Sequence, residues 1–524
     1  MIHARHFATL VTLFVGVSLN AQFVLNWEKN YGGSERDFIE DIIVDSNGDI
    51  VACGHSESDT LVVSVNDDGF DRLVSDNFGE FDYWITKVNA QGELLWERNL
   101  GGSEGDNATS ILETDDGGYL VLGLAQSMDY NISENKGSND VWLVKLNSVG
   151  HIVWARIIGG SGSDEPNKII KSSEGGYLLV GNSWSSDGDI SSNNGVKDGM
   201  ILKLDDSGYI EWQKSYGGSY TDQIRNAIEI PGEGYLLVGD TDSNDFDIPG
   251  NNGKSDMWIL KIDYDGNLFW SKTYGGSDHE GGLSIVQTDD DAFVVAGYTF
   301  SNDIDVNNGY GFGDGWIIKI DNDGNLIWEK TYGGSGRELI RTIIKGSDST
   351  YVFSGDTNSS DFDIETNLGF QDVWIGRIDL DGNLMYSNTF GGDDTDVNRG
   401  LIKLPNQKYI LGGASWSSNG DVGSNYGAYD FWIIEVEDPT SVSTNDFQIK
   451  NNINIYPNPS SGFINLESES QGILNIYTAD QRKILTVDIQ KGSNRIELNT
   501  SAKGILTLEL RSGNQVWMEK LIRM

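Results

Sequence analysis

Pairs of aspartates two residues apart recur along the chain within the pattern Ser-x-Asp-x-Asp. The pattern appears as "SSDGD", "SNDFD", "SNDID" and "SSDFD", and its carboxylates are Asp187, Asp189, Asp245, Asp247, Asp303, Asp305, Asp361 and Asp363. Carboxylates this close together, with Asn side chains and backbone carbonyls nearby, suit Ca²⁺, which prefers oxygen ligands. We therefore expect calcium sites in these segments, although none matches the EF-hand loop. The alternative is that the Ser, Asp and Asn side chains bind nearby backbone groups and hold turns.

Residues for other kinds of catalysis are scarce. Three histidines that follow the N-terminal segment, His55, His151 and His279, fall at different positions of the repeat described below, which argues against a His-based metal centre. The single cysteine, Cys53, lies in the apolar run "DIVACG", so we expect it to be buried rather than reactive. The chain has no phosphate-binding glycine loop and no Gly-x-Ser-x-Gly elbow. Glycoside hydrolysis needs only two carboxylates, and it stays open as a catalytic alternative.

The charge balance restricts the classes of partner. The chain has 36 Lys and Arg residues against 80 Asp and Glu residues, which gives a formal net charge of −44. Phosphate backbones would be repelled, so we expect no nucleic-acid partner. Divalent cations and neutral ligands such as glycans are compatible with this charge, and an acidic surface also serves solubility alone.

The paired aspartates lie within a long sequence repeat that is marked by double glycines. Double glycines begin at Gly32, Gly101, Gly159, Gly217, Gly275, Gly333 and Gly391. The first interval is 69 residues and the others are 58, so the first unit has an 11-residue insertion, within residues 56–80. A fixed period of this length predicts a repeat architecture.

Two acidic positions keep the phase of the repeat. One stands four residues after the second glycine: Asp37, Asp106, Asp164, Asp222, Glu280, Glu338 and Asp396. The other precedes a Trp or Met by two residues: Asp82, Asp140, Asp198, Asp256, Asp314, Asp372 and Asp430. Because a residue present in every unit serves the unit, we expect these acids to cap turns and to pair with a lysine. A basic residue recurs five residues after the second acid in six units: Lys87, Lys145, Lys203, Lys261, Lys319 and Arg377. The recurring Trp residues are expected to pack between units.

Each unit reads as four β-strands. In the unit that begins at Gly275 these are "GLSIVQT", "AFVVAGYT", "GWIIKID" and "NLIWEKTY", and "DNDGN" forms a tight hairpin between the last two. Four-stranded units of this length predict the blades of a β-propeller, here with seven blades in an all-β fold. An open β-solenoid is the alternative architecture.

The seventh unit ends after its third strand, and the N-terminal segment "LNWEKNY" supplies the missing fourth one. This arrangement resembles the closure of WD-repeat propellers, and "KIDYDGNLFW" resembles pyrroloquinoline-quinone-type propeller repeats. Closure by the N-terminal strand would remove an exposed sheet edge, whereas a solenoid would cap its ends. We expect Trp27 to pack beside Trp432 and not with the core of the first blade.

In propellers, the loops that join blades and the loops between second and third strands share one face. Both recurring motifs fall in these loops, so this face is the expected binding face. Trp184 and Trp416 each lie there in the sequence "SWSS". An aromatic ring at such a place either stacks on a sugar or packs within the fold.

The N-terminal sequence "MIHARHFATLVTLFVGVSLNAQ" combines a basic start with a short apolar stretch. The stretch is too short to span a bilayer and predicts a secretory signal peptide, residues 1–21, cleaved after Ala21. We expect no transmembrane segment elsewhere. The propeller would occupy residues 22–438, and Pro439 with the following Ser and Thr residues predicts a linker over 439–450.

Residues 451–524 predict a small Ig-like β-sandwich. Tyr456, Pro457, Asn458, Pro459 and Gly462 resemble the type A C-terminal sorting domain of the type IX secretion system of Bacteroidetes, as do "NIY" at 475–477 and "GI" at 504–505. Leu506 stands where that family usually has Tyr. The resemblance implies export through the periplasm by the type IX secretion machinery, to the cell surface or the medium.

These observations favour a secreted or cell-surface β-propeller that binds a glycan or protein ligand. The alternative is a secreted carbohydrate-active enzyme, a hydrolase or lyase that uses carboxylates of the binding face. One deep pocket with two carboxylates that break the repeat would favour the enzyme, and a uniform acidic face would favour binding.

Overall fold

The computed structural model describes residues 22–58, 61–65, 71–74, 77–346, 349–438, 454–456, 463–468, 471–477, 483–498, 504–512 and 515–523. The predicted signal peptide and linker lie outside these residues. The chain divides into two compact units between Asp438 and Pro439. In the described residues, no helix has the length and apolar character needed to cross a membrane.

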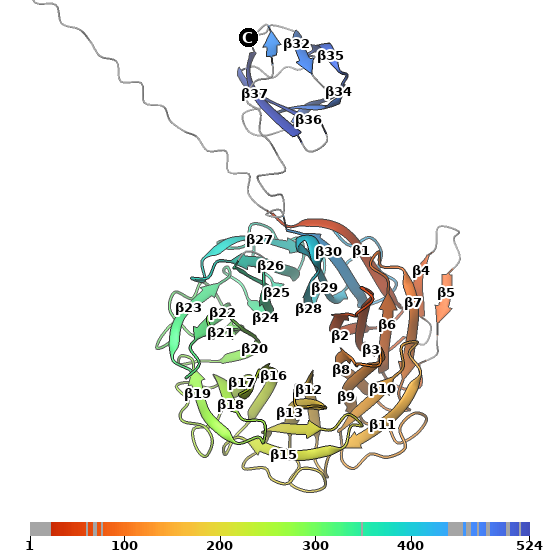
Figure 1. Ribbon diagram of the computed structural model, residues 1–524, viewed down its shortest axis with the longest axis vertical. Helices are drawn as coiled ribbons and strands as arrows, with labels where there is room; N and C mark the ends of the chain where they lie inside the picture. Colours follow the sequence, from red (N-terminus) through yellow and green to blue (C-terminus); the bar gives the residue numbers. More distant parts are fainter. Residues whose placement is uncertain are drawn as a thin grey trace, which may run out of the picture. The chain divides into compact units, whose positions relative to one another are not determined.

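The first unit is a seven-bladed β-propeller over the described part of residues 22–438 (Figure 1), as predicted. Each blade is an antiparallel sheet of four strands, and the first strand of each blade lies nearest the axis of the ring. Blade 1 consists of β2 (Asp37–Val44), β3 (Ile50–Ser56), β6 (Asp82–Val88) and β7 (Leu94–Leu100), and blade 2 of β8 (Asp106–Glu113), β9 (Tyr119–Ala125), β10 (Asp140–Leu146) and β11 (Ile152–Ile158). Blade 3 consists of β12 (Asp164–Lys171), β13 (Tyr177–Ser183), β14 (Asp198–Leu204) and β15 (Ile210–Tyr216). Blade 4 consists of β16 (Asp222–Ile230), β17 (Gly234–Thr241), β18 (Asp256–Ile262) and β19 (Leu268–Tyr274). Blade 5 consists of β20 (Glu280–Gln287), β21 (Phe293–Thr299), β22 (Asp314–Ile320) and β23 (Leu326–Tyr332). Blade 6 consists of β24 (Glu338–Lys345), β25 (Tyr351–Thr357), β26 (Asp372–Ile378) and β27 (Leu384–Phe390). Blade 7 consists of β28 (Asp396–Lys403), β29 (Lys408–Ser415), β30 (Asp430–Glu437) and the N-terminal β1 (Val24–Gly33). A 3₁₀ turn, η1 (Pro405–Gln407), precedes β29.

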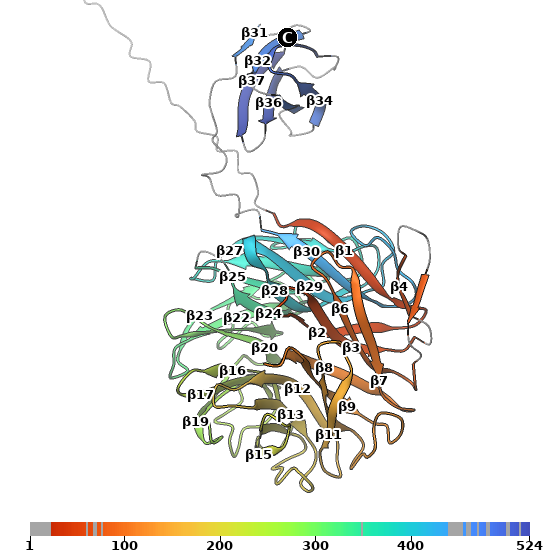
Figure 2. The same cartoon turned by 45° about the vertical axis from the view of Figure 1, so that its right-hand side comes forward.

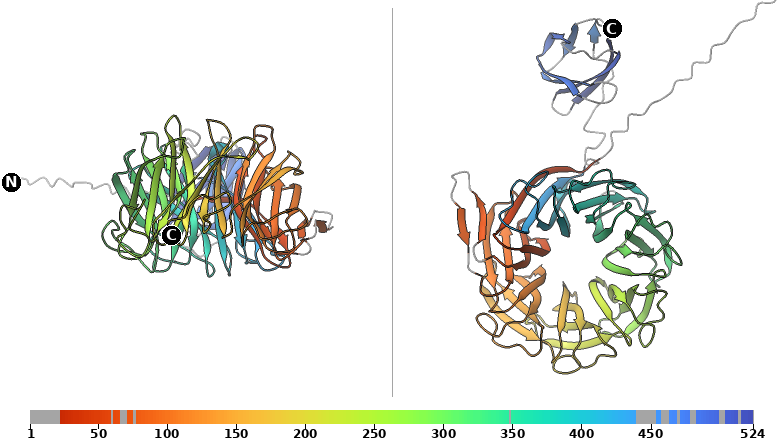
Figure 3. Two further views of the ribbon diagram at one scale, coloured as in Figure 1. Left: turned by 90° about the horizontal axis from the view of Figure 1, so that it is seen from below. Right: turned by 180° about the vertical axis from the view of Figure 1, so that it is seen from behind.

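The ring closes through β1, which pairs with β30 as the fourth strand of blade 7 (Figure 2). The pairing is antiparallel and runs from Val24 opposite Glu437 to Tyr31 opposite Phe431. The prediction of closure by the N-terminal strand is therefore confirmed. The last two residues of β1 also pair with β4 (Leu61–Val65), which pairs with β5 (Asp71–Val74). This hairpin is the predicted insertion, and it lies at the outer rim of the ring (Figure 3).

The prediction that Trp27 packs beside Trp432 is wrong. Trp27 lies opposite Glu435 on β30 and packs on a core cluster that contains Ile39 and Trp84 of blade 1. Trp432 belongs to a different cluster, with residues of blade 6. Successive side chains of a strand point to opposite faces of its sheet, so Trp27 faces the next blade while Trp432 faces the preceding one.

The core consists of layers between neighbouring blades, which confirms the predicted packing role of the Trp residues. Trp142 of blade 2, for example, contacts Tyr83 of blade 1 at 4.6 Å between ring centroids. The indole rings of the third strands are fully buried in such layers: Trp84, Trp142, Trp258, Trp316 and Trp374. Cys53 is also fully buried in the layer between blades 1 and 2, as expected.

The second unit contains two small sheets. One has β31 (Asn454–Tyr456), β32 (Phe463–Ser468) and β35 (Gly492–Glu497), and the other has β34 (Lys483–Ile489), β33 (Gly472–Tyr477), β36 (Gly504–Ser512) and β37 (Gln515–Arg523). Buried side chains of both sheets, including Ile464, Leu474 and Leu508, form one core cluster. The arrangement is a β-sandwich, as predicted.

Candidate binding face

One face of the propeller carries both recurring motifs, and we call it the loop face. It is formed by the double-glycine turns, which precede each first strand, and by the b–c loops, which join the second and third strands of a blade. In blade 3, side chains bind four consecutive amide groups of the double-glycine turn: Gly159 by Asp189 (3.1 Å), Gly160 by Asp164 (2.7 Å), Ser161 by Asp187 (2.7 Å) and Gly162 by Ser185 (2.9 Å). The Ser-x-Asp-x-Asp segment therefore holds the turn of its own blade.

Blades 4 to 6 repeat these contacts. The first aspartates accept from turn amides at 2.7–2.8 Å: Asp245 from Ser219, Asp303 from Ser277 and Asp361 from Ser335. The second aspartates accept at 3.1–3.3 Å: Asp247 from Gly217, Asp305 from Gly275 and Asp363 from Gly333. All eight predicted calcium ligands thus bind the backbone of their own blade.

Two blades show that this contact needs an acceptor and not a charge. In blade 7, Asn419 replaces the first aspartate and accepts from the amide of Asp393 at 3.0 Å. In blade 2, Asn131 replaces the second and accepts from Gly101 at 3.2 Å. Within the described residues, no group of three or more His, Cys, Asp or Glu residues is placed to hold a metal ion. The aspartates fit the turn-holding role better than a calcium site, and calcium binding stays a prediction.

The double glycines are required by two close approaches. A Cβ atom on Gly159 would lie 1.9 Å from Asp140 Oδ1, and one on Gly160 would lie 2.7 Å from the Cβ of Ser185. The first glycine therefore makes room for an aspartate of the preceding blade, and the second makes room for the b–c loop.

At each junction between blades, the two recurring acids form a buried pair. The pairs are Asp430–Asp37, Asp82–Asp106, Asp140–Asp164, Asp198–Asp222, Asp256–Glu280, Asp314–Glu338 and Asp372–Asp396. One oxygen of the first member caps the turn four residues before it, as Asp82 does for the amide of Phe78 at 2.5 Å. Its other oxygen, Oδ1, has no hydrogen-bond partner among the described residues in any of the seven pairs.

Burial and the neighbouring acid raise the pKa of these carboxyls. Burial is the larger cause, and it raises the pKa of Asp82 and Asp372 to about 7 and that of Asp256 to about 6. A proton on one member of the pair removes the repulsion between the two carboxylates.

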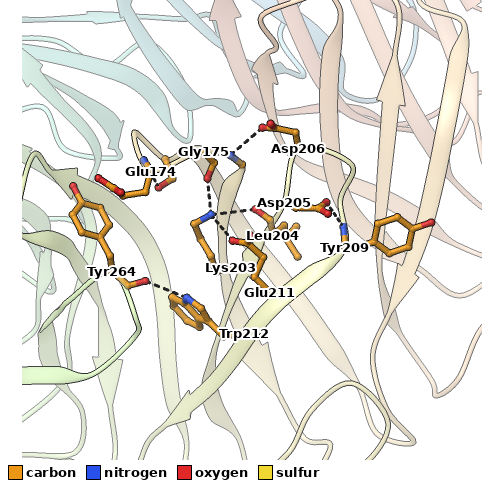
Figure 4. Close-up of polar contacts among 12 residues, drawn as sticks. Glu174, Gly175, Lys203, Leu204, Asp205, Asp206, Tyr209, Glu211, Trp212 and Tyr264 are labelled. Atoms are coloured by element: carbon orange, nitrogen blue, oxygen red, sulfur yellow. Dashed lines mark hydrogen bonds and ion pairs between the residues drawn. The ribbon is translucent and has the colours of Figure 1, made fainter.

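The recurring lysines do not pair with these acids, in contrast to the expectation. They lie at the other end of the third strands, on the opposite face of the ring, where Lys87 contacts Asp45 at 2.7 Å. Figure 4 shows the equivalent Lys203, which donates to the carbonyl of Gly175 at 2.6 Å and pairs with Glu211 at 3.0 Å. The third strand is seven residues long, with the acid, here Asp198, at its start and the lysine, here Lys203, near its end. The two side chains are therefore too far apart along the strand to pair.

The b–c loops also present apolar side chains in a backbone conformation that favours glycine. The residue between the two turn-holding side chains has a positive φ in six blades: Tyr130 (50°), Gly188 (65°), Phe246 (53°), Ile304 (61°), Phe362 (55°) and Gly420 (71°). The four non-glycine side chains are 59–71% exposed. For a β-branched residue such as Ile304, this conformation is a genuine outlier.

Further exposed apolar residues accompany two of these positions, Ile304 on blade 5 and Phe362 on blade 6. We call the set, together with Phe246 on blade 4, the apolar arc: Phe246, Ile304, Tyr310, Phe312, Phe362, Leu368 and Phe370. The rings of Tyr310 in blade 5 and Phe362 in blade 6 lie 5.4 Å apart and join the two loops. The arc was not predicted from the sequence, although apolar residues inside otherwise polar loops were its signal.

The two loop-face tryptophans are partly covered. Lys197 Nζ lies 4.3 Å from the centre of the Trp184 ring, and the ring of Tyr429 lies 5.0 Å from that of Trp416. Each indole therefore packs within the fold and keeps part of its surface exposed.

Three arginines on the innermost strands break the seven-fold repetition. They occupy the same register of blades 4, 6 and 7, where blade 5 has Leu283. The ion pairs are Arg225–Asp240, Arg341–Asp356 and Arg399–Glu40. The third pair links blade 7 to blade 1, so only the closed ring brings its members together.

The sorting motif lies mostly outside the described residues. Tyr456 is the last residue of β31 and pairs with Asn465 of β32. Pro457, Asn458, Pro459 and Gly462 are not among the described residues.

Comparison with known proteins identifies the second unit. Residues 454–524 match the family described as the secretion system C-terminal sorting domain. The chain therefore carries such a domain, which confirms the resemblance seen in its sequence.

For the propeller, similarity is remote. The regulatory protein FlaEY of Caulobacter vibrioides is 22% identical over 247 residues, which cover 41% of this chain and 26% of that protein. The chain thus spans about a quarter of the length of this relative. Among solved structures, the dihydro-heme d1 dehydrogenase NirN has a TM-score of 0.36 at 11% identity, over 89% of this chain and 77% of that one. PorZ, a surface component of the type IX secretion system of Porphyromonas gingivalis, has a TM-score of 0.20 at 9% identity, over 93% and 75%.

Proposed function

We propose that this β-propeller, addressed for export by its C-terminal sorting domain, is a binding protein of the cell surface or the medium. Its loop face would take a glycan or protein ligand, and the type IX secretion machinery would be its export partner. The observation that carries the proposal is the apolar arc, which exposes seven large apolar side chains on three adjacent blades. Exposed apolar patches mark interaction sites, and the contact between the rings of Tyr310 and Phe362 joins two of these three blades.

The loops that carry the arc are held in place before any ligand arrives. Both aspartates of each Ser-x-Asp-x-Asp segment accept hydrogen bonds from the turn of the same blade, as Asp245 does from Ser219. A surface fixed in this way loses little conformational freedom on binding, which favours affinity. A binding role also agrees with the repetition of the loop face, since a single catalytic centre needs residues that differ between blades.

The direct test is a binding screen on the secreted protein, with a glycan array and a set of candidate cell-surface proteins. We expect binding to a member of one class without chemical change of the ligand. Absence of binding to every glycan and protein tested, on correctly folded protein, would contradict the proposal.

The alternative is a secreted carbohydrate-active enzyme, and one observation favours it. The carboxylates Glu40, Asp240 and Asp356 lie on the inner strands at positions that break the repeat, as a single catalytic centre would require. Each of them is paired with an arginine. A polysaccharide-degradation screen tests this alternative, with the Asp240→Asn/Asp356→Asn variant as the inactive control.

A further inference from the structure

We propose that the apolar arc is the docking surface for a protein whose contacting face combines apolar side chains with lysines and arginines. The inference rests on the proposed binding function and names the ligand class and the place where it binds. Three observations carry it: backbone conformation, clustering of the side chains and charge.

The backbone conformation shows that the apolar side chains are not there to support the loops. Blades 3 and 7 have glycine at the left-handed position, Gly188 and Gly420, and their loops keep the same turn contacts as blades 4 to 6. Glycine adopts this conformation without strain, whereas isoleucine does so at a cost. Ile304 nevertheless stands there with φ 61°, and its side chain is exposed. Strain of this kind is retained where the side chain serves a function.

Three of the four strained side chains are gathered on one sector of the ring, and the fourth, Tyr130, lies on blade 2 beside the ring of Phe78. Phe246, Ile304 and Phe362 come from three consecutive blades, and Phe312 and Phe370 extend the surface on two of them. Aromatic anchors grouped on a rigid surface are typical of the centre of a protein interface.

The charge around the arc selects the partner. The b–c loop segments 242–255, 300–313 and 358–371 contain eight acidic residues and one basic residue, Lys254. Lys254 is paired with Asp278 at 2.9 Å, and the nearby Arg337 lies over the ring of Phe300. The surroundings of the arc are therefore strongly negative. A cationic protein face is steered to such a surface, an anionic polymer is repelled, and a neutral glycan gains nothing from the charge.

The test uses the full chain and a variant that replaces the three strained residues by glycine, Phe246→Gly/Ile304→Gly/Phe362→Gly. The probe is a synthetic peptide of alternating Leu and Lys, compared with its Leu and Glu counterpart and with neutral oligosaccharides. We expect the chain to bind the Leu and Lys peptide, with an affinity that falls as salt is added. The triple variant should lose at least about tenfold in affinity, as loss of central anchors does. Its melting temperature should stay the same or rise, because the strain is relieved.

The matched control changes exposed apolar residues elsewhere, Val153→Ser/Ile327→Ser on the outer strands β11 and β23. This control should keep wild-type affinity. Equal binding of both peptides, unchanged affinity of the triple variant, or a lower melting temperature of that variant would overturn the inference. If neutral oligosaccharides bind and the triple change leaves their binding intact, the proposed function stands and this inference falls. If no peptide, protein or glycan binds, both fall.

Discussion

Asp140 Oδ1 of blade 2 occupies the space that a side chain on Gly159 would need, 1.9 Å from the position of its Cβ atom. The contact joins the third strand of one blade to the turn that enters the next, and the same relationship recurs at every junction. The most repetitive letters of the sequence, the double glycine and the aspartate, are therefore parts of one contact between blades.

Gly159→Ala should destabilise the propeller. The added Cβ would press on the buried carboxyl of Asp140, and overpacking of this kind typically costs about 1–3 kcal/mol. Urea unfolding followed by tryptophan fluorescence measures the change. Gly250→Ala is the control, since no atom lies within 4 Å of a Cβ placed there. Equal stability of the two variants would contradict the close approach.

The buried acid pairs should make the propeller more stable at mildly acidic than at basic pH. Asp82 and Asp372 titrate near 3.8 in the unfolded chain, and burial raises their pKa in the fold to about 7. Between these two pH values the folded state binds more protons than the unfolded state. The stabilisation that these carboxyls add to the folded state is therefore fully present below about pH 4 and is lost as the pH rises through about 7. Thermal melts at pH 5 and pH 8 should show the higher melting temperature at pH 5.

A variant isolates the cause of this pH dependence. Asp82→Asn/Asp372→Asn/Asp430→Asn keeps the acceptors for the turns and removes three titrating groups. The difference in melting temperature between pH 5 and pH 8 should shrink. An unchanged difference would assign the pH dependence to other groups.

Removal of residues 23–31 should open the ring. The deletion takes away Phe23 and most of β1, and it removes two side chains, Phe23 and Tyr31, that are buried in the layers on either side of blade 7. We expect a large loss of stability across the whole propeller, measured by hydrogen exchange of the amides in all seven blades. Loss of protection confined to blade 1 would speak against closure by this strand.

Calcium binding can be tested directly on the predicted aspartates. If the sites exist, chelation by EDTA should lower the melting temperature, and calorimetry should detect Ca²⁺ uptake by the chelated protein. The variant Asp245→Asn/Asp303→Asn/Asp361→Asn keeps an acceptor for each turn, as Asn419 does in blade 7. It should reduce the uptake to that of blade 3, where Asp187 and Asp189 are unchanged. No uptake and no effect of EDTA would leave turn holding as the role of these residues.

Deletion of residues 451–524 should trap the propeller in the periplasm. These residues include the whole match to the sorting domain, and the propeller is a separate compact unit that keeps its own core. Fractionation with an antibody against the propeller measures the distribution between periplasm, surface and medium. Normal secretion of the truncated protein would show that another segment directs export.

Most of the fold could be predicted from the repeat in the sequence. The 58-residue period, the strand patterns and the missing fourth strand of the last unit predicted seven blades and their closure, because each blade repeats the same local pairing. The side of β1 that Trp27 occupies was mispredicted. The repeat predicts that Trp27 points to the same face of its sheet as the equivalent Trp of the other units. Only the register of β1 with β30 shows which neighbouring blade that face contacts.

The sequence by itself determined the repeat, the export signal at the C-terminus and the acidic character of the surface, since each of these is a property of residue order or composition. Tertiary structure decided what the acids do. Asp187 and Ser161 are 26 residues apart in the chain and meet only because the b–c loop folds back over its own turn. The apolar arc and the pair of Arg399 with Glu40 likewise depend on contacts between blades, which residue order along one strand does not specify.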